Sequence, residues 1–269
     1  MALVPFPGPQ SGAIQLPQDD DEDSPGGRMS FLEHLDELRK RIIHACLGIV
    51  AGVVVGFFFI DRIFSFLMAP ARAALPAGTT LIYTQPGEAF SLYISVSLIS
   101  GALIAAPYIM YQVWMFIAPG LYSNEKRLAI PFVLFSTLGF IGGAAFNHYV
   151  AFRFIMTFFA SFNSIDLRFM PKLSDVFGLY TKMLLGIGII FQMPTVVFFL
   201  AKMRMVTAGF LAKQFKFALL LIFVLAAVIT PTGDPMTQLI FAAPMILLYG
   251  LSIGIAWVVR PRRIADASS

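Results

Sequence analysis

The sequence predicts an all-α membrane protein with six transmembrane helices, and composition is the first reason. The chain is 58% hydrophobic and 13% charged, with a mean hydropathy of +0.80, whereas a soluble domain is about half apolar and about a quarter charged. The apolar residues also form blocks of about twenty, the length a helix needs to cross a hydrocarbon core of about 30 Å. Lipid offers no partners to the backbone, so each block should be helical.

The first expected element is a charged, amphipathic helix over Ser30–Arg41 that continues into the first apolar block. Ser30 and Glu33 fit the S-x-x-E capping box, which favours a helix start at Ser30. The apolar positions that share one face are Phe31, Leu35, Leu38 and Ile42. This spacing predicts that one side of the segment lies on lipid or protein and the other in water.

Six spans follow, and proline residues in or beside them predict bent helices and a cupped bundle. The prolines are Pro107, Pro131, Pro194 and Pro244. The predicted spans are Ile42–Ile60, about Phe90–Tyr108, Leu128–Val150, Val176–Leu200, Phe215–Ile229 and about Met236–Trp257. The fifth is short, about 22 Å as a helix, so it must thin the bilayer or rely on its neighbours.

Basic residues predict the orientation. They gather beside the termini and in the loops after spans two and four, whereas the opposite loops hold few, so both termini should be cytoplasmic. Residues 1–28, which contain an acidic run and several Pro and Gly, are expected to form a disordered cytoplasmic tail. Residues 29–260 should form the membrane domain, and residues 261–269 a short cytoplasmic tail.

Two long loops are expected on the outer side, Asp61–Gly87 and Ala151–Asp175. Within the first, the piece Ile63–Met68 is expected to rest on the membrane surface.

Neither catalysis nor a cofactor is indicated. The sequence has no phosphate-binding glycine motif, no Ser, His and Asp set, and no carboxylate pair within the spans. The single Cys46 excludes an intrachain disulfide and a thiolate metal site. His34, His44 and His148 have no ligand-like spacing, so no metal is expected. The mild basic excess follows from membrane topology rather than from nucleic-acid binding.

Carboxylates on the predicted cytoplasmic side are the candidate binding groups. Glu37 lies in the opening helix, and Glu125 lies in the aromatic-rich loop Tyr111–Arg127. A carboxylate beside apolar rings in a partly dry setting is a suitable receptor for a guanidinium group. The alternative is that Glu37–Arg41 and Asp36–Lys40 are ordinary i, i+4 ion pairs, and that the aromatic residues form an interfacial belt.

Three separate segments resemble the TatC family, the membrane subunit of the twin-arginine protein translocase. They are HLDELRKR at His34–Arg41, YQVWMFIAPGLYSNEKR at Tyr111–Arg127, and TPTGDPMTQLIFAAP at Thr230–Pro244. The resemblance implies a six-span protein of a bacterial or archaeal cytoplasmic membrane. It also implies a receptor for the twin-arginine signal peptides of folded precursors, which works with single-span TatA/TatB-type subunits in a multimeric complex driven by the proton motive force.

The resemblance also implies roles for individual residues. Glu37 and Glu125 look like the two acids that meet the paired arginines, Phe116 like the loop aromatic residue of that site, and Arg39 and Arg41 like its supporting helix residues. Three further positions resemble family residues of the outer side, namely Pro70 in the first outward loop and Asp234 and Gln238 at the outer end of span six.

Gln192 departs from the family pattern, which often has a glutamate in span four. A glutamine cannot titrate, so a proton-linked role here is in doubt. Two explanations stay open: Gln192 satisfies the backbone opened by Pro194, or it contacts a single-span partner inside the cupped face. Apart from the resemblance, a small-solute permease is the alternative function, although such proteins usually carry intramembrane charges or broken helices.

Overall fold

The protein was described from a computed structural model that covers residues 31–76, 78–117, 129–164, 168–230 and 234–259. Its helices, in chain order, are α1 (Phe31–Phe58), α2 (Ile60–Ala74), α3 (Glu88–Ile117), α4 (Ala129–Phe146), the π-helical turn η3 (Asn147–Ala151), α5 (Phe152–Ala160), α6 (Leu173–Ile190), α7 (Met193–Lys202), α8 (Ala208–Lys213), α9 (Phe215–Ile229) and α10 (Pro235–Val258). The predicted tails and the cap residue Ser30 lie outside these ranges, as does Glu125.

The predicted all-α, multi-pass fold is confirmed. Five helical segments are long and apolar enough to cross a bilayer, and the shorter α9 has the predicted bounds of the fifth span. The long segments are Leu32–Phe58, Glu88–Ile117, Ile130–Ala160, Leu173–Lys202 and Pro235–Val258. Each contains the central part of one predicted span, so the apolar blocks located the spans correctly.

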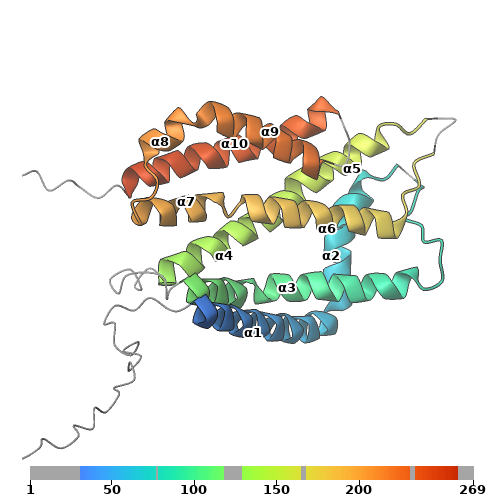
Figure 1. Cartoon of the computed structure of the whole chain (residues 1–269). Coiled ribbons are helices and arrows are strands. Elements are labelled where there is room, and N and C mark those ends of the chain that lie inside the picture. The colour runs from blue at the N-terminus through green and yellow to red at the C-terminus, as the bar shows by residue number, and fades with distance from the viewer. Residues whose placement is uncertain (1–30, 77, 118–128, 165–167, 231–233, 260–269) are drawn as a thin grey trace, which may run out of the picture.

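The spans have two common ends, which we name faces (Figure 1). At the N-terminal face α1 begins and α3, α7 and α10 end. At the distal face α3, α6 and α10 begin and α5 ends, and α2 runs there crosswise to α1 and α3. The start of α1 and the end of α10 lie at the same face, as an even number of spans requires.

The first two long helices form a close pair through small residues. A Cβ atom on Gly52 of α1 would fall on the carbonyl oxygen of Gly101 in α3, and one on Gly101 would lie 2.5 Å from the backbone nitrogen of Val53. Only glycine permits this approach, as at other helix contacts in membranes. We call this contact between Gly52 and Gly101 the glycine seam, and it brings α1 and α3 close together.

Two predicted boundaries were wrong because helices continue past the expected ends. The second span runs on to Ile117, past Pro107 and into the segment predicted as a loop. The third continues through the π-helical turn to Ala160, which shortens the second long loop. The first outward connection contains a helix of its own, α2, and Pro70 lies buried inside it. Packing of these segments against neighbours outweighs the local proline signal.

The fourth span bends as predicted. It divides into α6 and α7 at Phe191 and Gln192, just before Pro194, which lies in the first turn of α7.

The main core extends from α2, α5 and α6 through the bundle to α9 and α10. Its fully buried side chains include Met68, Phe152, Ile155 and Met183. The expected surface segment Ile63–Met68 is thus part of a longer helix, and Leu67 and Met68 face protein.

A buried carboxylate, Glu88, joins the distal segments. One Glu88 oxygen accepts hydrogen bonds from the backbone amides of Thr84 and Gln85, at 3.0 and 3.4 Å, and the other accepts from the amide of Ser174 at the start of α6, at 3.1 Å. The Lys172 ammonium lies 3.5 Å away. Glu88 therefore satisfies free amides beside two helix starts with one side chain.

Candidate functional site

The polar contacts between α1 and α3 at the N-terminal face form the candidate site. The Glu37 carboxylate accepts a hydrogen bond from Nε of Arg41, at 2.6 Å, and an ion pair links the same two side chains. Nη1 of Arg41 donates to Oε1 of Gln112 in α3, at 3.3 Å. The predicted Glu37–Arg41 pair is confirmed, and Gln112 extends it between the helices.

An aromatic contact lies beside this pair. The His34 ring of α1 stacks on the Phe116 ring of α3, with centroids 4.5 Å apart and planes 21° apart. Helical periodicity places His34 on the same side of α1 as Glu37 and Arg41, and Phe116 one turn after Gln112 on α3. We call these five residues the α1–α3 contact set: His34, Glu37, Arg41, Gln112 and Phe116.

The contact set combines charge with incomplete burial. The side chains of Glu37 and Arg41 are each 18% exposed, whereas Gln112 is buried. A partly dry carboxylate binds a guanidinium more strongly than one in bulk water does. Because some of the pair is open to solvent, a second guanidinium can reach it from outside.

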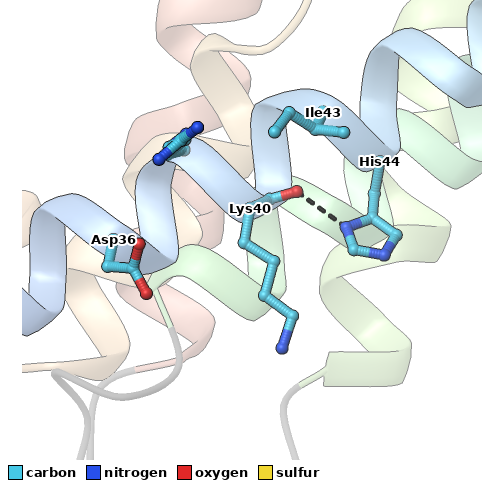
Figure 2. A pocket seen from close by; sticks show the side chains of 5 residues that line it. Asp36, Lys40, Ile43 and His44 are labelled. Carbon is cyan, nitrogen blue, oxygen red and sulfur yellow. Dashed lines mark hydrogen bonds between the residues drawn. The ribbon is translucent and has the colours of Figure 1, made fainter.

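Arg39 lies elsewhere on α1. It borders a shallow hollow of about 270 Å³ together with Asp36, Lys40, Ile43 and His44. Figure 2 shows Nδ1 of His44 directed at the carbonyl oxygen of Lys40, and these atoms are 2.7 Å apart. In the part of the chain that the structure describes, Asp36 and Lys40 form no ion pair, so that prediction was wrong. Arg39 belongs to this hollow and not to the contact set.

The aromatic residues of Tyr111–Arg127 do not act as a single belt. Trp114 is buried in α3 and contacts Phe132 and Phe199, with ring centroids 5.2 Å away in both cases. Phe116 contacts α1, and Tyr111 is exposed. The belt interpretation is therefore wrong for Trp114, which holds α3, α4 and α7 together. Glu125 lies outside the described residues, so its place relative to Glu37 stays a prediction.

Gln192 bonds to a neighbouring helix. Its side-chain Nε2 donates to the carbonyl oxygen of Ser136 in α4, at 3.0 Å. The explanation that it satisfies the backbone opened by Pro194 was wrong, because the amide is directed across to α4. The contact fixes the bend between α6 and α7 against the third span.

The residues expected at the outer end of span six have structural partners. Asp234 caps α10, since its carboxylate accepts from the backbone amide of Thr237 at 2.7 Å. Gln238 donates from Nε2 to the carbonyl oxygen of Phe223, at 2.9 Å, and so joins α10 to α9. With Pro70 buried in α2, all three lie far from the contact set, toward the distal face.

Sequence reasoning missed Gln112 and Glu88. Tyr108, Gln112 and Phe116 recur every four residues, and a Cβ on Gly48 of α1 would lie 2.6 Å from the Tyr108 ring. This spacing would have indicated an α3 face against α1 if the segment after Tyr111 had been read as helix. Glu88 binds the nearby amides of Thr84 and Gln85, but its bond to Ser174 could not be found from the sequence, because Ser174 is remote in the chain.

Fold and site together define a class: a multi-pass helical membrane protein that holds a carboxylate–guanidinium pair between its first two long spans. Among the described residues, no group of three His, Cys, Asp or Glu side chains is placed to hold a metal ion. The family follows from three comparisons.

Residues 33–244 match the family model of the Sec-independent protein translocase protein TatC. The TatC protein of Koribacter versatilis is 44% identical over 239 residues, covering 87% of each chain. That of Desulforapulum autotrophicum is 39% identical, covering 88% of this chain and 87% of its own. The crystal structure of the twin-arginine translocase receptor TatC superposes with a TM-score of 0.72 at 34% identity, covering 84% of this chain and 99% of that one. The chain belongs to the TatC family, and it is a translocase component rather than an enzyme.

Proposed function

We propose that this chain is the receptor subunit that binds the Arg-Arg motif of twin-arginine signal peptides, with Glu37 and Glu125 as the two acceptors. The observation that carries the proposal is the Glu37–Arg41 pair, partly open to solvent and beside the His34–Phe116 stack. The related crystal structure is that of a protein described as a twin-arginine translocase receptor.

Exchange of guanidinium groups explains how Glu37 becomes available. An i, i+4 ion pair on a helix contributes only about 0.3 to 0.5 kcal/mol, whereas a hydrogen bond to a charged group contributes about 1.5 to 3 kcal/mol. An incoming arginine that makes such bonds can therefore displace Arg41 from Glu37. Arg41 keeps its hydrogen bond to Gln112, so the displaced guanidinium retains a partner.

Two arginines in tandem require two acceptors. Guanidinium forks bind carboxylates with two parallel hydrogen bonds, which a lysine cannot reproduce. Glu125 follows α3 by only a few residues in sequence, which suits it to supply the second carboxylate near the contact set. Phe116 would then cover the aliphatic part of the first arginine, and Arg39 would act from the neighbouring hollow.

This function requires the N-terminal face to be cytoplasmic, as the basic residues predict, in a bacterial or archaeal cytoplasmic membrane. We place single-span TatA/TatB-type partners of the multimeric complex at the apolar groove between α4, α7 and α10. The groove encloses about 1000 Å³, and its lining includes Gly139, Phe191 and Pro194, close to Gln192. Cross-links from Gln192 to a partner helix are expected, and their absence in an assembled complex would contradict this position.

Site-specific photocross-linking tests the receptor function. A photoreactive residue at position 37 or 125 should cross-link to an Arg-Arg signal peptide, and Glu37→Ala or Glu125→Ala should abolish discrimination between Arg-Arg and Lys-Lys peptides. Asp36→Asn is the matched control, since it removes an equal charge from the same helix outside the contact set. Equal peptide binding by the parent chain and both alanine variants would refute the assignment.

A further inference from the structure

A second hollow lies at the distal face, between the end of α2 and the start of α6. It encloses about 390 Å³. Its walls include the apolar side chains of Phe64, Leu81 and Leu173, and its polar groups are Arg72, Thr79 and Thr80. The proposed receptor function uses none of these residues. A cation and two hydroxyl groups above apolar walls form an amphipathic site.

Arg72 is oriented by an aromatic ring rather than by a carboxylate of the described residues. Its guanidinium carbon lies 5.6 Å from the centroid of the Phe64 ring, which orients it by a cation–π contact. Within the described ranges no carboxylate forms an ion pair with Arg72. Of the acids in the adjoining segments, Glu88 binds Lys172 and backbone amides, and Asp61 accepts from the Tyr93 hydroxyl at 3.3 Å.

A second cation lies near one edge of the hollow. Nη2 of Arg168, from the loop before α6, donates to the carbonyl oxygen of Gly78, at 3.4 Å. Gly78 has φ of +77°, a left-handed conformation that suits glycine and lets the chain turn between Pro76 and Thr79. The turn places Thr79 and Thr80 beside the hollow, so Arg72 lines the hollow and Arg168 binds the chain next to it.

We propose that this hollow binds the phosphate group of an anionic phospholipid. Arg72 supplies the charge, the Thr80 hydroxyl donates to a phosphate oxygen, and the apolar walls cover the first carbons of an acyl chain. Figure 1 shows α2 running crosswise to α1 and α3 on the distal side of the bundle, where we expect the outer head groups of the bilayer. The positive charges of Arg72 and Arg168 favour a head group without its own positive charge, such as that of phosphatidylglycerol, over one with a positive charge, such as that of phosphatidylcholine.

Native mass spectrometry of the full chain tests the proposal. The parent chain should retain phosphatidylglycerol in preference to phosphatidylcholine, and Arg72→Gln should lower phosphatidylglycerol affinity by about tenfold. Arg62→Gln is the matched control, because Arg62 is an exposed arginine of the same helix outside the hollow, and it should stay within about twofold. Arg72→Lys should give an intermediate affinity, because lysine keeps the positive charge but lacks the paired N–H donors of a guanidinium group.

Two competition measurements identify the molecule that supplies the phosphate. Glycerol phosphate, which lacks acyl chains, should not displace the lipid at concentrations where added phosphatidylglycerol does. Displacement by glycerol phosphate at equal concentration would overturn the lipid assignment, and so would competition by a soluble acidic peptide. Equal retention of both lipids, or wild-type affinity of a folded Arg72→Gln chain, would overturn the site itself.

Discussion

Two carboxylates, one at each face of the bundle, are used in opposite ways. Glu88 at the distal face is buried and accepts hydrogen bonds from three backbone amides besides its contact with Lys172. Glu37 at the N-terminal face is held by one arginine side chain, and both are partly exposed. The backbone amides cannot leave Glu88 without unwinding structure, whereas Arg41 can leave Glu37 by rotating its side chain.

The difference separates a structural acid from a binding acid. A buried carboxylate whose partners are main-chain groups stabilises the fold and has no capacity for a ligand. A carboxylate whose only described partner is a mobile side chain can exchange it. The number and kind of partners, rather than the residue type, indicate which acid serves the proposed receptor.

The largest effect is expected from Glu88→Ala. The substitution leaves the amides of Thr84, Gln85 and Ser174 without their acceptor and the Lys172 charge without its partner. The free energy of unfolding should fall by about 2 to 3 kcal/mol, because hydrogen-bond donors lose a charged acceptor, when measured by denaturant titration in detergent. Lys172→Gln is the control and should cost about 1 kcal/mol, because that side chain is 30% exposed. Similar losses of unfolding free energy for the two variants would contradict the structural role assigned to the Glu88 carboxylate.

An intermediate effect is expected from Gly52→Ala, which tests whether the seam supports the N-terminal face. The added methyl would meet the Gly101 carbonyl, so α1 and α3 must separate at a cost of about 2 kcal/mol in unfolding free energy. Gly178→Ala in α6, where a Cβ meets nothing within 4 Å, is the control and should be neutral or stabilising by up to about 1 kcal/mol. Equal stabilities for the two variants would show that the seam is not tightly packed.

Glu37→Gln should separate binding from stability. Affinity for an Arg-Arg signal peptide should fall about tenfold or more, since a bond to a charged group is worth about 1.5 to 3 kcal/mol. The unfolding free energy should change by no more than about 0.5 kcal/mol, the value of an i, i+4 pair. Peptide titration and denaturant unfolding of the same preparation measure both. A large stability loss with unchanged affinity would place Glu37 in the same category as Glu88.

The smallest effect is expected from His34→Leu. Loss of the stack with Phe116 removes about 0.5 to 1 kcal/mol, which should weaken peptide binding about two- to fivefold. His44→Leu is the control, because His44 lies further along α1, borders the hollow and is not a member of the contact set, and it should leave the affinity unchanged. If both histidine variants weaken binding equally, the aromatic contact has no specific role.

The sequence predicts the fold more completely than it predicts the candidate site. Apolar blocks set the number of spans because lipid imposes a single length and a helical backbone on each of them. Helix ends were less predictable, since α3 runs past Pro107 to Ile117 and the third span continues through η3 to Ala160. These ends depend on tertiary contacts, such as the packing of Trp114 on Phe132 and Phe199.

For the site, helical spacing predicted the Glu37–Arg41 pair correctly, since both residues lie on one helix. Gln112 could not be found that way, because its contact with Arg41 depends on which helix packs beside α1. The same applies to Gln192 and Ser136, which are joined across two spans. The family resemblance supplied the roles of Glu37 and Glu125 that spacing left open.

The order of residues along the chain gives the glycine seam a consequence for biogenesis. Every member of the α1–α3 contact set lies between His34 and Phe116, so the ribosome has synthesised the whole set before it reaches α4. The Glu88 carboxylate, by contrast, can bind the Ser174 amide only after α6 has been synthesised. During membrane insertion the two faces are therefore completed at different times. The α1–α3 contact set is complete once the first two long spans have been inserted. The Glu88–Ser174 contact of the distal face can form only after the fourth span has been inserted.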